Sequence, residues 1–502
     1  MLRNLRVVLI STSALALGAC SSSNTNPTPD SGPPAVTCAG SPPTCNIPAG
    51  ATESAIDSAV ASAVAGTTFV FAETDAPFTF TNTLAIPGVA NLTFTGAGIG
   101  KTVLDFSNQT SGSGGISAVL GNSNLRFNNF TVQNTSGDGI KVMSATGVLF
   151  EKVQVTWQAA DGGALPTLLH GGYGIYPVQS QGVVIDNCQI SGARDTGAYV
   201  GQSNDIIVSN NLVSQNVAGI EIESSLNADV YGNESTQNSG GILVFALPNL
   251  QPPPGTPPGT TDACANVRVF NNNIHDNNTV NFADPSGTVA QVPAGTALVV
   301  LAAQNVEIFN NTITNNDTAG VGVVNYFLIN PDFNPLPAGN PTGLYPFPNN
   351  VYIHDNTFTN NGTAPISYNV YASDGGTNSN ELGELLLVLG PFLYTAWPAN
   401  TPDLAWDGIA PPSFFPDYTP PSGRNDMGVP PNPINMWLQN NHDANGTNGA
   451  ASFVNLNLTV VTGGTSNISD PGAVNFNSVG FDITDGGPAG FPLPPVDAGI
   501  SP

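Results

Sequence analysis

The sequence predicts an all-β solenoid, a single-stranded parallel β-helix whose short strands stack coil upon coil. The first observation is a phrase of alternating apolar and polar residues that occurs eight times. Its fixed position is filled in turn by Phe130, Val153, Cys188, Asn211, Asn233, Asn272, Asn311 and Asn356. The second observation is the period. Three gaps are 22 or 23 residues, and the others, 35, 39, 39 and 45 residues, correspond to one period plus an inserted loop. Repeats of this length without a helical period are typical of a β-helix.

The Asn residues of the repeat predict how the coils turn their corners. A buried corner leaves backbone groups that need polar partners, and an Asn amide can donate to one neighbouring coil and accept from the other. We therefore expect a structural ladder formed by Asn211, Asn233, Asn272, Asn311 and Asn356. The preceding column is the alternative ladder, formed by Asn129, Asn187, Asn210, Asn271 and Asn310. A reading as plain loops is disfavoured, because the third residue before the fixed position is always Val, Ile or Phe.

Composition restricts the partners. The formal net charge is −26, with nine basic and 35 acidic residues. So few basic residues argue against nucleic acid and against electrostatic docking to anionic lipid. They also disfavour a polyanionic substrate.

The N-terminus predicts export and lipid attachment. Arg3 and Arg6 precede an apolar run, which ends in Leu17-Gly-Ala-Cys20, a lipobox. The run is too short for a transmembrane helix. We expect a lipoprotein signal peptide at 1–20, with lipidation of Cys20, and the following Ser21 favours the outer membrane of a diderm bacterium. The membrane would be reached only through this anchor.

The remaining chain divides into three expected parts. Residues 21–45 form a Pro/Ser-rich tether, 46–372 the β-helix, and 373–502 an irregular region that caps the far end or wraps back along the solenoid. Cys38 and Cys45 lie close together in an exported segment and predict a disulfide. No cysteine pair has the spacing of a zinc site.

A helix and four insertions complete the prediction. A capping helix over 51–65 has Thr52 as its N-cap, an apolar stripe of Ile56, Val60 and Val64, and Gly66 as its stop. Insertions at 156–172, 247–264, 276–294 and 325–350 are expected to surround one face of the solenoid.

That face carries the candidate chemistry. Alternation along five aligned strands places two columns outward. The first is Lys141, Tyr176, Tyr199, Glu221 and Leu243, and the second is Met143, Val178, Gly201, Glu223 and Phe245. Glu221 and Glu223 are then about 6.6 Å apart along the strand, near the spacing of a two-carboxylate site.

These residues define the expected sites. The catalytic candidates are Glu221, Glu223, Asp195 and Tyr199. The substrate-binding candidates are Tyr173, Tyr176, Tyr199, Arg194, Gln202 and Glu221, with the Tyr rings as a flat platform for sugars. The two glutamates are also a weak calcium site, and we expect no other metal or cofactor. The alternative is an ordinary solvated face, in which the Tyr residues only cover inserted loops.

The repeats resemble the right-handed parallel β-helix of the pectate-lyase-like superfamily. GGYGIYPVQS (171–180), DTGAYVGQSNDIIVSNN (195–211) and NVAGIEIESS (216–225) are similar to exported bacterial β-helix repeat lipoproteins. That resemblance covers about residues 50–360. It implies an envelope address and a c-type cytochrome-like partner, but no established activity. Alginate epimerases and lyases of this fold carry a YG-apolar-DPH segment, and here Tyr176 and Val178 stand in place of its Asp and His.

Three functions follow as hypotheses. The first is a surface-anchored β-helix lipoprotein that binds a glycan or a partner protein on the face built from residues 170–245. The second is a polysaccharide lyase, epimerase or hydrolase with non-standard catalytic residues. The third is an accessory subunit of an envelope redox complex linked to a cytochrome.

Overall fold

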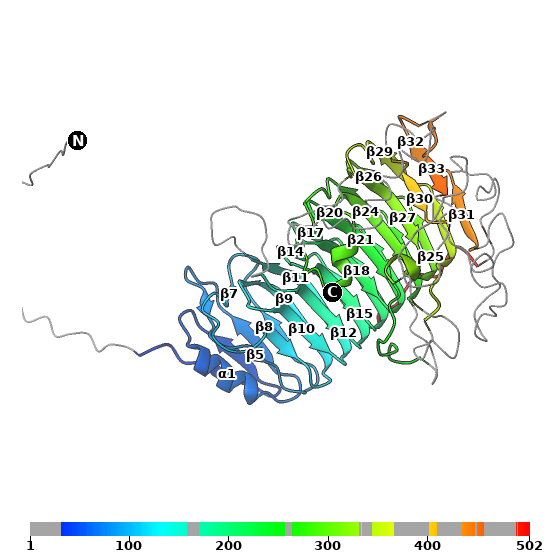
Figure 1. Ribbon diagram of the computed structural model, residues 1–502. Coiled ribbons are helices and arrows are strands. Elements are labelled where there is room, and N and C mark those ends of the chain that lie inside the picture. The colour runs from blue at the N-terminus through cyan, green and yellow to red at the C-terminus, as the bar shows by residue number, and fades with distance from the viewer. Residues whose placement is uncertain are drawn as a thin grey trace, which may run out of the picture.

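The computed structural model describes residues 32–157, 170–256, 264–330, 333, 344–365, 401–408, 434–446, 449–455, 488 and 490–501. In these ranges the chain winds into one elongated stack of coils (Figure 1). The strands form two sheets, here called sheet A and sheet B. Of the strand pairs between described residues, only β1 (Thr37–Ala39) with β2 (Thr44–Ile47) is antiparallel. The predicted parallel β-helix is confirmed.

Sheet B takes one strand from each successive coil. Its strands are β5 (Leu84–Ala85), β8 (Gly114–Ala118), β10 (Asp138–Met143), β12 (Tyr173–Val178), β15 (Thr196–Gly201), β18 (Ala218–Glu223), β21 (Gly240–Phe245), β24 (Thr296–Leu301), β27 (Ala319–Val324), β30 (Leu404–Trp406) and β33 (Phe453–Asn455). Two 3-10 helices lie in the insertions beside it, η1 (Thr288–Gln291) and η2 (Tyr326–Leu328).

Sheet A contains two rows of strands. The first row continues from β2 through β3 (Thr68–Phe71), β6 (Thr93–Thr95), β9 (Ser123–Gln133), β11 (Thr146–Thr156), β13 (Gln181–Asp186), β16 (Asn204–Ser209), β19 (Leu226–Tyr231), β22 (Ala265–Phe270), β25 (Gln304–Phe309), β28 (Asn349–His354) and β31 (Met436–Gln439). The second row is β4 (Phe78–Thr79), β7 (Val103–Asp105), β14 (Gln189–Ser191), β17 (Leu212–Ser214), β20 (Glu234–Thr236), β23 (Asn273–His275), β26 (Thr312–Thr314), β29 (Thr357–Thr359) and β32 (His442–Asp443). The long strands β9 and β11 pair in both rows.

The fixed repeat position is the Asn ladder. Asn211 Nδ2 donates to Asn233 Oδ1 at 2.9 Å, and the same bond recurs through Asn272, Asn311 and Asn356 to Asn441, each at 2.9–3.0 Å. The alternative column is not a ladder. Asn210 and Asn271 are exposed there and have positive φ values of 56° and 55°, so that column supplies the left-handed residue of the turn.

A second ladder lies five residues further along each repeat and was missed in the sequence. Asn216, Asn238, Asn277, Asn316 and Asn361 are joined by Nδ2-to-Oδ1 bonds of 2.9–3.1 Å. The signal was visible, since each of these copies has a second Asn at the same offset. In the early coils a buried stack of Phe69, Phe94, Phe127 and Phe150 runs through the core instead, with ring centroids 4.8–5.4 Å apart.

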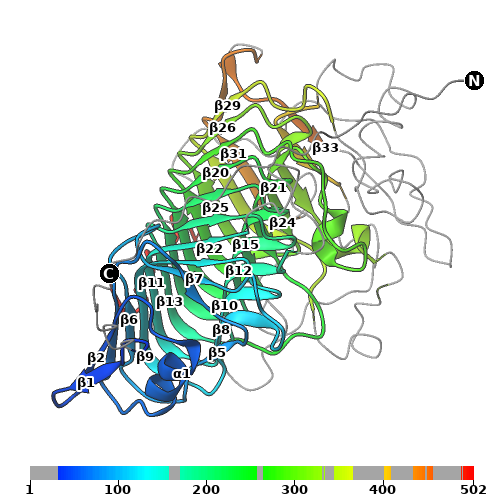
Figure 2. The ribbon, with the colours of Figure 1, turned by 90° about the vertical axis from the view of Figure 1, so that its left-hand side faces the viewer.

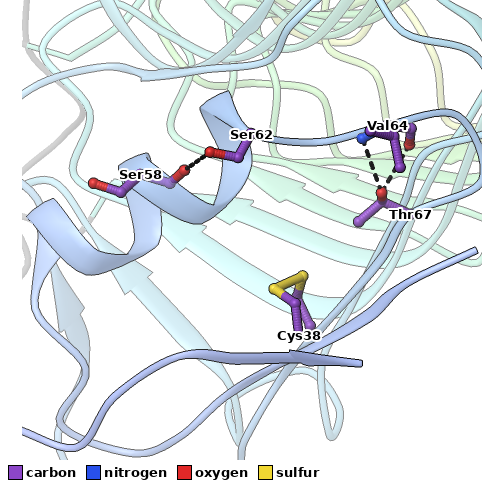
Figure 3. Close-up of a disulfide and its surroundings, with 6 residues drawn as sticks. Cys38, Ser58, Ser62, Val64 and Thr67 are labelled. Atoms are coloured by element: carbon purple, nitrogen blue, oxygen red, sulfur yellow. Dashed lines mark hydrogen bonds between the residues drawn. A yellow bond between two sulfur atoms is a disulfide. The ribbon is translucent and has the colours of Figure 1, made fainter. Parts of the chain in front are cut away.

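The N-terminal end begins earlier than predicted. β2 pairs with β3 in parallel, so the β-helix already includes residues 44–47 and the predicted tether boundary at 45 is wrong. β1 joins β2 in a hairpin before the first coil. Cys38 and Cys45 are disulfide-bonded across the β1–β2 hairpin (Figure 3). This arrangement follows from the antiparallel register, which places the two cysteines opposite each other.

The capping helix α1 (Glu53–Ala61) is shorter than predicted. Thr52 is its N-cap, and Ile56 and Val60 are buried. The expected extension to Val64 is wrong, because that side chain is 54% exposed. The Thr67 hydroxyl bonds both the N–H and the carbonyl of Val64, and this turn takes the backbone groups that a longer helix would need (Figure 3).

The C-terminal region continues the coils and then wraps back along the solenoid, which was one of the two expected arrangements. β30, β31 and β32 pair in register with β27, β28 and β29, and β33 pairs with β30, so the coils continue and the predicted end of the β-helix at 372 is wrong. Residues 490–501 then run back along sheet A, and the C-terminus lies beside β11 and β13 (Figure 2). No helix in the described part of the chain is long and apolar enough to cross a membrane.

Candidate functional site: a tyrosine and carboxylate cluster on sheet B

The outward columns of sheet B have the predicted register. Lys141 pairs with Tyr176, Tyr199 with Glu221, and Glu221 with Leu243. Glycines near the start of these strands leave space for side chains that pack against them. A Cβ on Gly174 would lie 2.4 Å from Ile190 Cγ2, and one on Gly241 would lie 2.6 Å from Ile274 Cγ2. Only glycine leaves room for the apolar side chains of sheet A at these positions.

Three tyrosines on two neighbouring strands form one aromatic cluster. The ring centroids of Tyr173 and Tyr176 are 4.3 Å apart, and Tyr199 lies 4.7 and 5.0 Å from them. The rings are inclined at 24° to 72° to one another. Lys141 Nζ lies 4.7 Å from the centroid of the Tyr176 ring. The expected flat platform is therefore wrong, because these rings pack against one another and only parts of Tyr173 and Tyr176 remain exposed.

Tyr199 extends over its own strand to reach a carboxylate. Its hydroxyl donates to Glu223 Oε1 at 2.6 Å. Gln202 Nε2 donates to the Tyr199 hydroxyl oxygen and to Glu223 Oε1, each at 3.1 Å. A Cβ on Gly201 would lie 2.2 Å from the Tyr199 hydroxyl oxygen. Gly201, next to Glu223 in the register, thus makes the Tyr199–Glu223 contact possible.

Glu221 is a buried acid that is linked to Asp195 through the buried hydroxyl of Thr196. It is 1% exposed, and its Oε1 has no hydrogen-bond partner among the described residues. Its Oε2 lies 2.7 Å from Thr196 Oγ1, which also lies 3.1 Å from Asp195 Oδ1. The Thr196 hydroxyl has one hydrogen for these two contacts. A protonated Glu221 that donates to Thr196, which donates to Asp195, satisfies both.

The electrostatics agree with a protonated Glu221. Burial, followed by repulsion from Glu223 and Asp195, raises the pKa of Glu221 well above its usual value. Burial also raises the pKa of Glu223 to about 7, against hydrogen bonds from Tyr199 and Gln202. The pKa of Asp195 is raised to about 6 by burial, against hydrogen bonds from Thr196 and Tyr173 and the charge of Arg194. The three acids cannot all ionise cheaply in one buried cluster.

A polar cleft of about 590 Å³ opens where the strands of sheet B begin. Its charged lining is Asp138, Arg194, Asp195 and Asp284, and Tyr173, three serines and four glycines complete it. Arg194 Nη1 and Asp284 Oδ2 are 3.8 Å apart, which links the insertion at 276–294 to the strands. Lys141 lies 3.9 Å from Asp138, whose pKa is raised by burial. The arrangement can accept hydrogen bonds from hydroxyl groups and can hold or release protons near neutral pH.

Residues 108–251 and 166–334 of the chain match the family model described as a right handed beta helix region. The chain carries a right-handed β-helix. This match confirms the predicted handedness and the resemblance on which it rested. No curated protein matches the chain significantly.

Solved structures match the chain at low identity. The A-module of the Azotobacter vinelandii mannuronan C-5 epimerase AlgE4 has a TM-score of 0.41 and 17% identity, over 62% of this chain and 85% of that one. A mutant of the periplasmic alginate epimerase AlgG has a TM-score of 0.38 and 13% identity, over 65% and 82%. A mutant tailspike of E. coli bacteriophage HK620, in complex with a pentasaccharide, has a TM-score of 0.37 and 13% identity, over 59% and 51%.

Part of the expected binding face of this β-helix is covered. Leu243 and Phe245 are 0% and 2% exposed. The insertion at 276–294 packs here, with Phe282 in the core and Val292 against Gly240. Tyr199, Glu221 and Gln202 are also buried, so direct substrate contact by these three is wrong for the state described. Tyr173, Tyr176 and Arg194 keep exposed parts, and Tyr173 and Arg194 line the cleft.

The insertions differ in what they enclose. The one at 276–294 borders the cleft as predicted, through Asp284, Ser286 and Gly287. The described start of the 247–264 insertion runs elsewhere, since the Pro254 carbonyl accepts a hydrogen bond from Asn204 on sheet A. Residues 257–263 of this insertion lie outside the described part of the chain, so its place around the face stays a prediction.

Two acids of the cleft, Asp138 and Asp284, were missed in the sequence. Asp138 directly precedes the glycine of an aligned strand and is in register with Gly114, so its place at the strand start could have been read from the repeat. Asp284 lies in an insertion, where no periodicity applies. Among the described residues no group of three or more His, Cys, Asp and Glu side chains is placed to hold a metal ion, so calcium at Glu221 and Glu223 stays a prediction.

Proposed function

We propose that the β-helix binds a neutral or weakly charged glycan in the cleft at the start of β10, β12 and β15. The observation that carries the proposal is the lining of this cleft, which brings the aromatic residue Tyr173 together with the acids Asp138 and Asp195. Aromatic rings pack on the C–H faces of sugars, and carboxylates accept hydrogen bonds from their hydroxyls. The cleft volume is within the usual range for ligand sites.

Charge restricts the glycan. Three carboxylates and one guanidinium line the cleft, on a chain with a formal net charge of −26. A polymer of uronic acids or sulfated sugars would therefore be repelled. We expect neutral oligosaccharides to bind in preference to anionic ones of the same length.

The test measures binding of matched neutral and uronic-acid oligosaccharides to the full chain by calorimetry. The Tyr173→Ala variant should lose at least tenfold in affinity for the neutral set. Tyr231→Ala is the matched control, because Tyr231 stacks on Phe270 on sheet A, away from the cleft, and it should bind like wild type. Equal binding by both variants, or a preference for the uronic-acid set, would refute the proposal.

Catalysis in the same cleft is the second proposal. It is favoured by Asp195, whose pKa is raised by burial to about 6, since an acid that changes protonation near neutral pH suits general acid–base chemistry. Burial also raises the pKa of the neighbouring Asp138. If the protein is a lyase, epimerase or hydrolase, the wild type should convert the oligosaccharide into a product. The Asp195→Asn variant should then bind the oligosaccharide and form no product. If the wild type binds the oligosaccharide and forms no product, catalysis is refuted and only the binding function remains.

We further propose lipid attachment at Cys20 and, as the rival to glycan binding, a cytochrome-linked protein partner. Cys20 lies outside the described residues, and lipid attachment there rests on the lipobox. Incorporation of labelled palmitate that is lost in Cys20→Ser would support the anchor. Co-purification with a haem protein in the absence of sugar would favour the cytochrome-linked subunit over glycan binding.

A further inference from the structure

One straight column of outward residues runs along the first row of sheet A, on a different face from the cleft. The register joins them strand by strand. They are Arg126, Leu149, Val184, Ile207, Asp229, Arg268, Glu307 and Tyr352. The column is charged at several positions and apolar in its middle. Residues 490–501, here called the strap, lie along it in the reverse direction.

Charged side chains of the column bind the backbone of the strap. Leu493 N–H donates to Glu307 Oε2 at 2.8 Å, and Arg268 Nη1 donates to the Leu493 carbonyl at 3.4 Å. Val496 N–H donates to Asp229 Oδ2 at 3.1 Å. Arg126 Nη1 donates to the Ser501 carbonyl at 3.0 Å. Glu307 and Asp229 are 1% and 4% exposed, so the strap lies in a built, desolvated site.

Apolar contacts alternate with these polar ones. Phe491 packs on Tyr352 at one end, with ring centroids 5.4 Å apart. Ala498 packs on Leu149 and Val184 near the other end. A Cβ on Gly182 would lie 2.4 Å from the Ala498 carbonyl oxygen. Any side chain at position 182 would therefore displace the strap.

The prolines of the strap fit the column. Positions 492, 494 and 495 are proline and have no N–H to satisfy, whereas Leu493 and Val496 supply the two N–H groups that meet carboxylates. An extended segment on an outward face must otherwise leave N–H groups without partners. The column thus selects an extended peptide with N–H donors three residues apart and prolines between them.

We propose that this column is a peptide-binding groove, that the strap occupies it as an intramolecular ligand, and that the same segment of a second copy of the chain can occupy it in trans. The groove binds the N–H groups of Leu493 and Val496 and the apolar side chains of Phe491 and Ala498. The same segment of a second copy carries the same groups. The chain's own strap competes at an effective concentration of about millimolar. Binding in trans therefore requires that the resident strap be loosened.

The experiment uses the full chain and a fluorescent peptide of residues 490–501 as the probe. The double variant Leu493→Pro/Val496→Pro removes both N–H donors from the resident strap and leaves the groove unchanged. It should bind the peptide at least tenfold more tightly than wild type does. A peptide with the same two prolines is the matched control and should bind neither chain.

Circular dichroism establishes that the variant keeps its strands, and limited proteolysis reports whether the strap is released. A released strap without tighter peptide binding would overturn the proposal, because the groove would then hold the segment only as a covalent extension. A strap that stays protected despite both prolines would also overturn it, since the two carboxylates would not be what holds it. Tight binding of the proline-substituted peptide would show unspecific adhesion.

Discussion

At the scale of single residues, burial decides what each acid of sheet B can do. Register alone predicted that Glu221 and Glu223 face outward, and they do. It could not predict that Glu221 is only 1% exposed, because the register places its neighbours Tyr199 and Leu243 beside it but does not say how far their side chains cover it. Burial raises the pKa of Glu221, and this direction agrees with a proton on Glu221 in the chain of contacts through Thr196 to Asp195.

We predict that the β-helix loses stability as pH rises from about 5 to 8. The pKa of Glu223 is raised to about 7 and that of Asp195 to about 6, so the folded state holds protons that the unfolded chain releases from about pH 4 upward. The stability that these two protonated acids contribute is fully present below about pH 4. It is lost as pH rises through their pKa values in the folded state. Its size is on the order of 3 kcal/mol.

Urea unfolding between pH 5 and 8 checks this prediction. Glu223→Gln should flatten the profile, because the amide cannot ionise. Glu73→Gln is the control, since Glu73 is exposed and pairs only with Lys101 on the surface. A wild-type profile that rises with pH over this window would contradict the account.

At the scale of elements, a structural Asn is recognised by the hydrogen bonds that it makes to the coils on both sides. Asn272 Nδ2 donates to the Val230 carbonyl and to Asn311 Oδ1, while its own Oδ1 accepts from the backbone and side chain of Asn233. All four amide contacts are used. The adjacent Asn271 is exposed with a φ of 55°. Both columns are rich in Asn in the sequence, and only the geometry of the turn separates their roles.

Asn272→Ala should therefore destabilise the fold by on the order of 4 kcal/mol, because it leaves several buried backbone and amide groups unpaired. Asn271→Gly is the adjacent control and should change the unfolding free energy by less than about 0.5 kcal/mol, since glycine accepts the positive φ. Urea unfolding of both variants measures the difference. Equal losses would mean that the ladder is not the structural column.

At the scale of the whole molecule, the sequence predicts what is periodic and misses what is not. The coil stack, its register and the first Asn ladder follow from a 22–23-residue period. The continuation into β30 to β33 was missed because long insertions separate these strands, although MWLQNN (436–441) repeats the phrase. The strap and the cover of sheet B follow no period, since their contacts join segments up to 375 residues apart.

The last prediction concerns how the two halves of the stack communicate. The early coils are held by stacked rings such as Phe127, and the later ones by amides such as Asn311. In a solenoid each coil contacts only its neighbours, so distant changes should act independently. Phe127→Leu should increase amide hydrogen exchange in β6, β9 and β11, Asn311→Ala should do so in β22, β25 and β28, and the double variant should show the sum. The strap is the one described segment that reaches from β28 to β9. If each single variant instead increases exchange along the entire stack, the strap couples the halves more strongly than contact between neighbouring coils does.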